Sequence, residues 1–279
     1  MSTLYICPTP LGNLEDITLR TLRVLRSVDI IAAEDTRHSR KLLEHFNISK
    51  PLVSYHQHSS SAQTEKLVAR IAAGESVALI SDAGTPGISD PGQSLIAMCI
   101  ESGINVESLP GPSAVITALA AAGFPLAAFT FLGFLPRKGR EAVNMIAEIA
   151  HPVVVYESPK RVKKLLERLD AKMPERPLLI ARELTKLHQE YIRGTVRSVL
   201  ADTDWDRVSR GEFTIVLGPW QPEVPEQDEG AIDAELAAVL ATGVSVRDGV
   251  QIVSSRLGVS KNLVYDIATK KKDGLSNPS

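Results

Sequence analysis

Short apolar runs alternate with amphipathic segments along the first 120 or so residues of the chain. The apolar runs have the length of buried strands, and the segments between them carry apolar residues at helical spacing. This alternation predicts a mainly parallel sheet covered by helices on both faces. The predicted strands are residues 4–7, 30–33, 52–55, 77–80 and 106–109, and the predicted helices are residues 18–26, 37–44, 62–73 and 92–101.

The next hundred residues are richer in strand patterns, which predicts a second α/β domain with a mixed sheet. Its predicted strands are residues 129–134, 153–156, 178–182, 191–195 and 212–217, and its predicted helices are residues 139–150 and 160–169. Residues 108–136 contain no charged residue, but prolines and glycines divide them into a short helix and a strand, so we expect no membrane span. The expected domains are residues 1–122 and 123–220.

Residues 221–230 are rich in proline and acidic side chains, which predicts a linker, and residues 231–279 form a small helical extension. Residues 246–257 and 261–272 are predicted helices joined by a turn that contains glycine, as in a helix-turn-helix. Lys261 begins the second helix and three further lysines lie near its end. Two interpretations remain open: an RNA-binding element, or a helical tail packed on the body with solvated lysines.

Composition narrows the function classes. The chain has 279 residues, 44% of them hydrophobic and 23% charged, as expected for a soluble globular protein. A formal charge of -2 argues against an overall basic nucleic-acid binder, although local basic clusters remain possible. The two cysteines lack metal-ligand spacing, and the N-terminus reads as a strand and not as a signal peptide, which favours a cytoplasmic protein without a disulfide framework or structural zinc. His56 and His58 have no acidic or cysteine neighbour in sequence, so no metal site is predicted.

The strand at residues 77–80 opens into a loop with three glycines and two prolines, Ser81-Asp-Ala-Gly-Thr-Pro-Gly-Ile-Ser-Asp-Pro-Gly92. Glycines let backbone amides approach a ligand, and prolines restrict the loop before binding. A second junction, Pro110-Gly-Pro-Ser113, has the same design. Because ligands bind beyond the carboxyl ends of parallel strands, these loops predict a small-molecule cleft. The P-loop and dinucleotide-binding fingerprints are both missing.

Charged side chains follow other predicted strands. Tyr156-Glu-Ser-Pro-Lys-Arg161 leads into a helix, and four cations lie within five residues at its start, where the helix dipole already disfavours positive charge. Phosphate contact is the functional interpretation and a solvated basic face is the alternative. Two further segments are basic, one near Arg137 and the other Ala181-Arg-Glu-Leu-Thr-Lys186. Together with the start of this helix they could form one RNA-facing edge of the protein. Glu34-Asp-Thr-Arg37 is either a functional cluster at a strand end or a helix cap.

These motifs, together with Pro8-Thr-Pro-Leu-Gly-Asn13 and Ala33-Glu-Asp-Thr-Arg37, resemble the tetrapyrrole (corrin/porphyrin) methylase superfamily and, within it, the ribosomal small subunit methyltransferase I group. The resemblance implies two α/β domains with S-adenosylmethionine (SAM) in the cleft between them, and a homodimer. It implies 2′-O-methylation of a cytidine ribose in the decoding region of 16S ribosomal RNA, in the small ribosomal subunit. The implied SAM contacts are Leu11, Gly84, Thr85, Gly87, Ser113, Ala114, Tyr156, Leu184, Phe213 and Thr214.

Methyl transfer to a ribose hydroxyl requires alignment of two atoms and is assisted by removal of the hydroxyl proton, without a metal. The candidate bases are Asp82, Glu157 and Glu183. The candidate RNA contacts are Arg37, Arg137, Lys138, Lys160, Arg161, Arg182, Lys186 and Lys261. Two other functions remain alternatives: a tetrapyrrole methylase of the same fold, and a non-catalytic SAM-responsive nucleic-acid binder.

Overall fold

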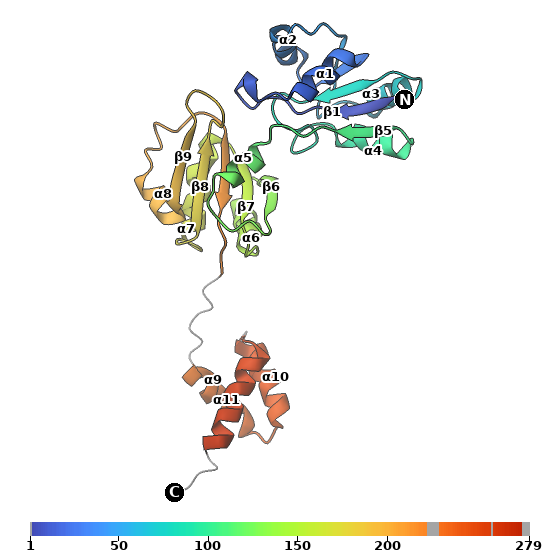
Figure 1. The fold of residues 1–279 in the computed structure, drawn as a ribbon. Helices are drawn as coiled ribbons and strands as arrows, with labels where there is room; N and C mark the ends of the chain where they lie inside the picture. Colours follow the sequence, from blue (N-terminus) through green and yellow to red (C-terminus); the bar gives the residue numbers. More distant parts are fainter. Residues whose placement is uncertain (1, 222–228, 258, 275–279) are drawn as a thin grey trace. The chain divides into compact units, whose positions relative to one another are not determined.

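The first sheet, drawn in blue to green in Figure 1, is built from the first 108 residues. Its strand order is β3-β2-β4-β1-β5, and every pair of neighbours is parallel. Its strands are β1 (Thr3–Ile6), β2 (Ile30–Ala33), β3 (Leu52–Ser54), β4 (Val77–Ile80) and β5 (Asn105–Ser108). The computed structural model describes residues 2–221, 229–257 and 259–274, with side chains to residue 269. The predicted parallel sheet is therefore confirmed.

Helices cover both faces of this sheet because alternate strand residues point to opposite sides. Ile31 and Ala33 of β2 pack in one core cluster with residues of α1 (Leu19–Ser27) and α2 (Thr36–His45). Ile30 and Ala32 pack in another with residues of α3 (Ser61–Ala72) and α4 (Gln93–Glu101). A short 3₁₀ helix, η1 (Leu14–Asp16), precedes α1. Burial of all four β2 residues on two faces explains why this strand has no polar position.

The second sheet is mixed, as predicted, with the order β6-β7-β10-β8-β9. Only β6 and β7 run parallel, and the other neighbours are antiparallel. The strands are β6 (Thr130–Phe134), β7 (Val153–Glu157), β8 (Pro177–Arg182), β9 (Glu190–Thr195) and β10 (Phe213–Leu217). On one face lie α6 (Gly139–Ala147), α7 (Pro159–Asp170) and α8 (Val196–Asp202). The last of these helices was not predicted.

The other face of the second sheet is covered by α5 (Ala114–Ala120), which follows the last strand of the first sheet. Val115, Ala118 and Leu119 of α5 pack against Val154 and Val216 of the second sheet. The helix α5 begins at Ala114, and the hydroxyl oxygen of the preceding Ser113 caps it by accepting the Ile116 amide N–H. The predicted boundary between the two α/β domains at residue 122 stays a prediction, and α5, which follows the first sheet in the chain, packs on the second sheet.

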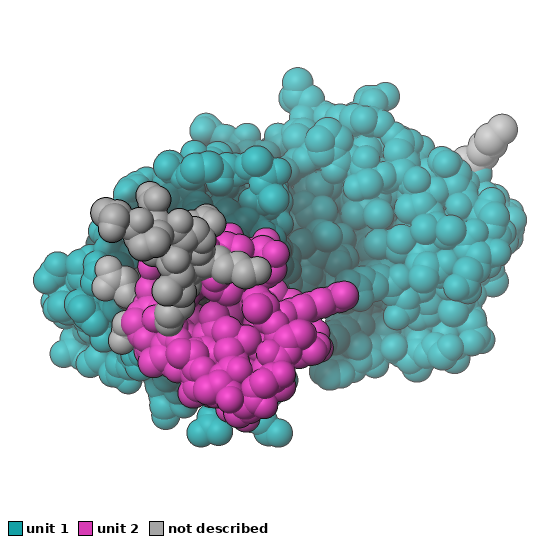
Figure 2. All heavy atoms as spheres, turned by 90° about the horizontal axis from the view of Figure 1, so that it is seen from below, with its two compact units in different colours: residues 1–220 teal, residues 221–279 magenta. Residues whose placement is uncertain are grey.

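Residues up to Trp220 form one compact unit, and residues from Gln221 onward form another (Figure 2). The described part of the second unit has three helices, α9 (Glu229–Leu240), α10 (Val246–Leu257) and α11 (Lys261–Gly274). They share a core of their own: Ile232, Leu236, Val239, Val250, Val253, Val264 and Ile267. The helices predicted at residues 246–257 and 261–272 are present.

Several predictions fall partly outside the described residues. Residues 222–228 of the predicted linker and residues 275–279 of the helical extension are among these, as are the side chains of Lys270, Lys271 and Lys272. In the part of the chain that is described, no helix has the length and apolar character needed to cross a membrane.

Candidate active site

The loops that follow β1, β4 and β5 are fastened to one another by backbone contacts. Thr9 and Gly84 exchange two backbone hydrogen bonds of 2.9 Å, and the Thr9 hydroxyl donates to the Ser81 carbonyl at 2.9 Å. The Thr85 hydroxyl donates to the Pro112 carbonyl at 3.0 Å. A side chain at Gly111 would overlap Pro8, so glycine lets these two loops approach closely. The glycine-rich sequence thus forms one ordered wall.

This wall faces the second sheet across a cavity of about 440 Å³, the central cavity. Its size lies in the ordinary range for small-molecule sites. Its lining residues are Leu11, Glu34, Asp82, Ala83, Gly84, Thr85, Ile88, Ser89, Asp90, Ser113, Ala114, Phe134, Tyr156, Glu157, Ser158, Pro159, Gly211, Glu212, Phe213 and Thr214. All the SAM contacts expected from the resemblance line this cavity except Gly87 and Leu184.

Those two residues have other positions. Gly87 has a φ of 84°, a conformation that favours glycine, and an added Cβ would lie 3.3 Å from Ile96. It therefore shapes the loop behind the cavity wall. Leu184 is 6% exposed and belongs to the core cluster that packs α5 on the second sheet. Neither residue lines the central cavity.

Three carboxyl groups line the first-sheet side of the central cavity: Glu34, Asp82 and Asp90. The Glu34 carboxylate accepts the Asp82 amide N–H at 3.4 Å, and the Asp82 carboxylate accepts the Asp35 amide N–H at 3.2 Å. Burial, with the nearby charges of Glu34 and Asp82, raises the pKa of Asp90 to about 6. Burial also raises the pKa of Glu34. Three acids sharing a partly buried wall favour a cationic ligand.

An aromatic cluster forms the opposite side. Tyr156 contacts Phe131 and Phe134 edge-on, with ring centroids 5.0 and 5.5 Å apart. Burial and the charge of Asp90 raise the pKa of Tyr156 to about 12, so its hydroxyl is neutral at physiological pH. Phe134 is 63% exposed and lines the central cavity, so its ring is available to a ligand there. The cavity therefore combines an acidic side with an aromatic one.

Glu157, the second candidate base, is 3% exposed, and both of its carboxylate oxygens have partners. One oxygen accepts the Ser158 amide N–H at 2.7 Å, and the other pairs with Arg161 at 3.2 Å. Arg161 also donates to the Leu135 and Pro136 carbonyls at 3.1 Å. Glu157 thus fixes the turn between β7 and α7, and its pairing with Arg161 stabilises the charged carboxylate.

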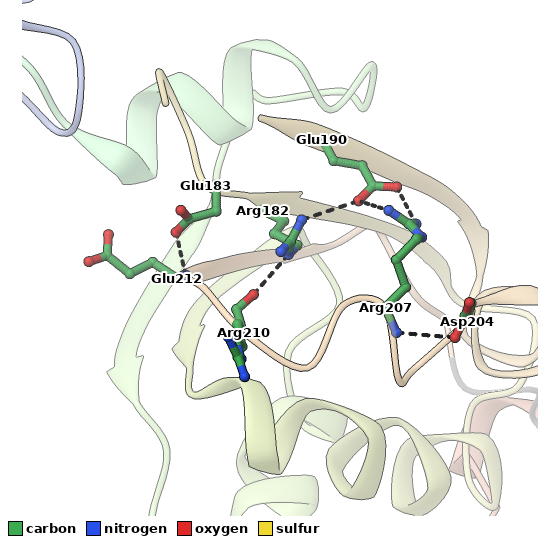
Figure 3. Close-up of polar contacts among 7 residues, drawn as sticks. All are labelled: Arg182, Glu183, Glu190, Asp204, Arg207, Arg210 and Glu212. Atoms are coloured by element: carbon green, nitrogen blue, oxygen red, sulfur yellow. Dashed lines mark hydrogen bonds and ion pairs between the residues drawn. The ribbon is translucent and has the colours of Figure 1, made fainter. Parts of the chain in front are cut away.

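Glu183, the third candidate, does not line the central cavity. Its carboxylate accepts the Glu212 amide N–H at 2.9 Å (Figure 3). It also accepts a hydrogen bond from Lys186 at 3.1 Å. Partial burial acts to raise its pKa, but these bonds outweigh burial and the net pKa is lowered. A weakened base that holds the loop before β10 is better suited to a structural role.

A second cavity, the side cavity, adjoins the central one. It has a volume of about 490 Å³ and shares Leu11, Asp82, Ala83 and Glu212 with the central cavity. Its other lining residues are Pro10, Gly12, Leu14, His38, Lys41, Leu42 and Lys186. Asp82 is therefore the only one of the three candidate bases that lines both cavities.

The predicted RNA contacts lie in different environments. Arg182 is largely buried, donates to the Arg210 carbonyl at 2.9 Å and pairs with Glu190 at 3.6 Å, as Figure 3 shows. The Arg37 side chain is 90% exposed and pairs with Asp35 at 3.1 Å. The others are placed as follows: Lys186 lines the side cavity, Arg137 and Arg161 line a cavity beside α7, Lys138 lies just before α6, and Lys160 and Lys261 are exposed at helix starts.

Glu34 belongs to the predicted functional cluster, but sequence reasoning assigned no site role to several other lining residues: Ala83, Ile88, Ser89, Asp90, Phe134, Ser158, Pro159, Gly211 and Glu212. Asp90 and Ser89 lie in the glycine-rich motif itself, so their position in the loop was a usable signal. Gly211 and Glu212 were not findable locally, because the pairing of β10 with β7 and β8 brings them to the cavity. No metal-binding group of three or more histidine, cysteine or acidic side chains occurs in the described portion of the chain.

The fold and its central cavity define a methylase of the tetrapyrrole type. Residues 3–200 match the family model of the tetrapyrrole (corrin/porphyrin) methylases. A solved uroporphyrin-III C-methyltransferase from Thermus thermophilus, complexed with S-adenyl homocysteine, has the same fold, with a TM-score of 0.52 and 19% identity over 77% of this chain and 97% of that one.

Closer relatives narrow the class. The chain is 47% identical to a ribosomal RNA small subunit methyltransferase I of Hydrogenobaculum over 217 residues, 77% of this chain and 94% of the relative. It is 39% identical to that of Synechocystis over 273 residues, 96% of this chain and 98% of the relative. The chain belongs to the ribosomal RNA small subunit methyltransferase I family, as the sequence motifs suggested.

Proposed function

We propose that this protein is a SAM-dependent methyltransferase that methylates the ribose 2′-oxygen of a cytidine in the decoding region of 16S ribosomal RNA. Family membership supports the reaction class. The observation that carries the site assignment is the sharing of Asp82 between two adjoining cavities. One of these cavities suits a cationic cofactor with an aromatic ring system, and the other presents cations to an anionic acceptor.

The central cavity has the chemistry that SAM requires. Glu34 and Asp90 favour the positive sulfonium and ammonium groups, and Tyr156 with Phe134 offers aromatic surface to adenine. Gly84 leaves free a space that a Cβ would fill, 3.4 Å from Leu11. We assign the SAM contacts to Leu11, Gly84, Thr85, Ser113, Ala114, Tyr156, Phe213 and Thr214. Gly87 and Leu184 would not contact SAM but would shape the residues that line the cavity. SAM supplies an electrophilic methyl group when it is bound.

The side cavity would hold the acceptor nucleotide. Lys41 and His38 line it and can contact phosphate. Lys186 also lines it, and Glu183 and Glu212, each at 3.1 Å, hold this side chain and offset its charge. A ribose in this cavity reaches the cofactor only across the shared wall of Leu11, Asp82, Ala83 and Glu212. Leu11 and Ala83 supply apolar surface that helps exclude water from the reacting atoms.

Asp82 is the favoured proton acceptor. One of its oxygens accepts the Asp35 amide N–H, and the other has no hydrogen-bond partner among the described residues. It can therefore take the proton from the acceptor hydroxyl as that oxygen attacks the methyl carbon. Glu157 and Glu183 are engaged by Arg161 and Lys186, which fits positioning roles.

The larger substrate is part of the proposal. The RNA backbone would be contacted by Arg37, Arg137, Lys138, Lys160 and Arg161. Arg182 would instead hold the loop before β10 in place through its hydrogen bond to the Arg210 carbonyl. The helical unit with Lys261 at the start of α11 would add a further RNA contact. We further propose a metal-independent homodimer in the cytoplasm, testable by light scattering in solution and by activity in EDTA.

The proposed function is tested with tritiated SAM and three acceptors: small ribosomal subunits from cells that lack the gene, free 16S RNA, and a reduced tetrapyrrole. Label in RNA alone is the expected result. Label in the tetrapyrrole alone would favour a small-molecule methylase of the same fold. Tight SAM binding and salt-dependent RNA binding without transfer to any acceptor would favour a non-catalytic binder.

A further inference from the structure

A third cavity, the α7 pocket, lies between the start of α6 and the exposed side of α7. Its volume is about 280 Å³, and its lining residues are Pro136, Arg137, Gly139, Ala142, Glu157, Arg161, Lys164, Leu165 and Arg168. Four of these side chains are cations and one is an acid. The pocket adjoins the central cavity, because Glu157 lines both.

The acid in this pocket does not neutralise the other cations. Glu157 is 3% exposed and pairs with Arg161 at 3.2 Å, so these two charges cancel. Arg137, Lys164 and Arg168 form no ion pair with any residue whose side chain the structure describes. The pocket therefore carries three uncompensated positive charges.

The arrangement of these charges is unfavourable without an anion. Lys164 and Arg168 are four residues apart on α7, so like charges lie on adjacent turns of one face. The Arg168 guanidinium lies against Gly139, where any Cβ would overlap it. Gly139 is the first residue of α6, and that helix has no side-chain cap. A cation beside the positive end of a helix dipole is disfavoured, and a bound anion reverses the sign of that interaction.

We propose that the α7 pocket binds a backbone phosphate of the RNA substrate, through Arg137, Lys164 and Arg168. This assignment rests on the proposed function, since RNA supplies the phosphate. Guanidinium groups pair with two phosphate oxygens at once, and the lysine adds a point charge. A polynucleotide with its acceptor ribose at the side cavity has further phosphates to either side, and the α7 pocket adjoins the central cavity at Glu157.

The test compares single and double variants at Lys164 and Arg168. Lys164→Ala with Arg168→Ala should weaken binding of undermethylated small subunits by about tenfold, with kcat and SAM affinity unchanged. The slope of log Kd against log salt should fall by about one. Lys66→Ala, which removes an exposed helical lysine outside the three cavities, should bind as the wild type does. Lys163→Ala removes the neighbouring charge outside the pocket and should have a smaller effect than Lys164→Ala.

The proposal is overturned if subunit binding by the double variant equals that of the wild type. In that case, loss of calorimetric binding of inorganic phosphate by the same variant would assign the pocket to a free phosphate. Methylation by the wild type is followed in the same samples. Its absence would contradict the proposed function, whereas its presence with unaffected variants contradicts the pocket assignment alone.

Discussion

Thr9 and Gly84 face each other in an isolated antiparallel bridge and exchange two hydrogen bonds of 2.9 Å. The loop after β1 and the glycine-rich loop after β4 therefore act as one rigid wall of the central cavity. Gly84 has a φ of 79°, which side-chain-bearing residues rarely adopt. Glycine is favoured at this position for two reasons: it adopts this backbone conformation without strain, and it leaves the space beside Leu11 open.

Gly84→Ala should weaken SAM binding by about 1–3 kcal/mol, because a methyl group beside Leu11 occupies cavity space. Gly103→Ala is the matched control. Gly103 has a φ of 70° and nothing within 4 Å of an added Cβ, so it shares the backbone strain without the cavity. Calorimetric titration with SAM separates them. Equal SAM affinity in the two variants would show that Gly84 does not shape the cofactor site.

Asp82→Asn should reduce kcat by about 10²- to 10⁴-fold, because asparagine cannot accept the hydroxyl proton. SAM affinity should be nearly unchanged, since an amide oxygen can still accept the Asp35 N–H. Single-turnover transfer and SAM titration measure the two quantities. Lost SAM binding would make Asp82 a cofactor contact, and an unchanged kcat would show that positioning suffices without a base.

SAM affinity should depend on pH through Asp90. Its folded pKa of about 6 lies above the usual value of 3.8, so the free protein holds this proton below pH 6. A cationic ligand favours the carboxylate, and binding should therefore strengthen as pH rises through about 6 and level off above it. Asp90→Asn should remove most of this dependence, and Glu34, whose pKa burial also raises, should be responsible for the remainder. A flat affinity between pH 5 and 8 in the wild type contradicts this role.

Much of the fold was predictable because the first sheet is buried on both faces. Its strands are continuous apolar runs, and the β2 and β4 ranges predicted from the sequence agree with the structure. The helix α8 was missed because its seven residues directly follow β9 without an intervening turn. Local pattern alone cannot separate so short a helix from the end of a strand.

The site was predictable where one motif carries it, as with Gly84 and Thr85, and not where pairing between distant strands creates it. Glu212 reaches the central cavity because Phe213 lies between Glu157 and Arg182 in the sheet. The order of strands β7, β10 and β8 sets this register, and no local spacing encodes it. Likewise, the sequence alone could not show that Arg182 and Glu183 have structural roles. Their contacts within the protein show it, because Arg182 is held by Glu190 and the Arg210 carbonyl, and Glu183 by Lys186 and the Glu212 amide.

Arg176 provides a stability test away from the site. It is fully buried, and its guanidinium donates to the carbonyls of Gly218, Ile146, Ile149 and His151 at 2.9–3.2 Å. Burial lowers its pKa to about 10, yet it stays charged at neutral pH. Arg176→Met should cost about 3 kcal/mol or more, because the carbonyls lose their donor. Urea unfolding measures this, and a loss below about 1 kcal/mol would contradict it.

The central claim is that the methyl group reaches a ribose oxygen of 16S RNA. Small subunits from cells lacking the gene are incubated with the wild-type protein and tritiated SAM, and the RNA is digested to nucleosides and mapped. Label on the 2′-oxygen of a cytidine in the decoding region, absent with Asp82→Asn, is the predicted result. Label on a base, or no label in RNA despite tight SAM binding, would contradict the account.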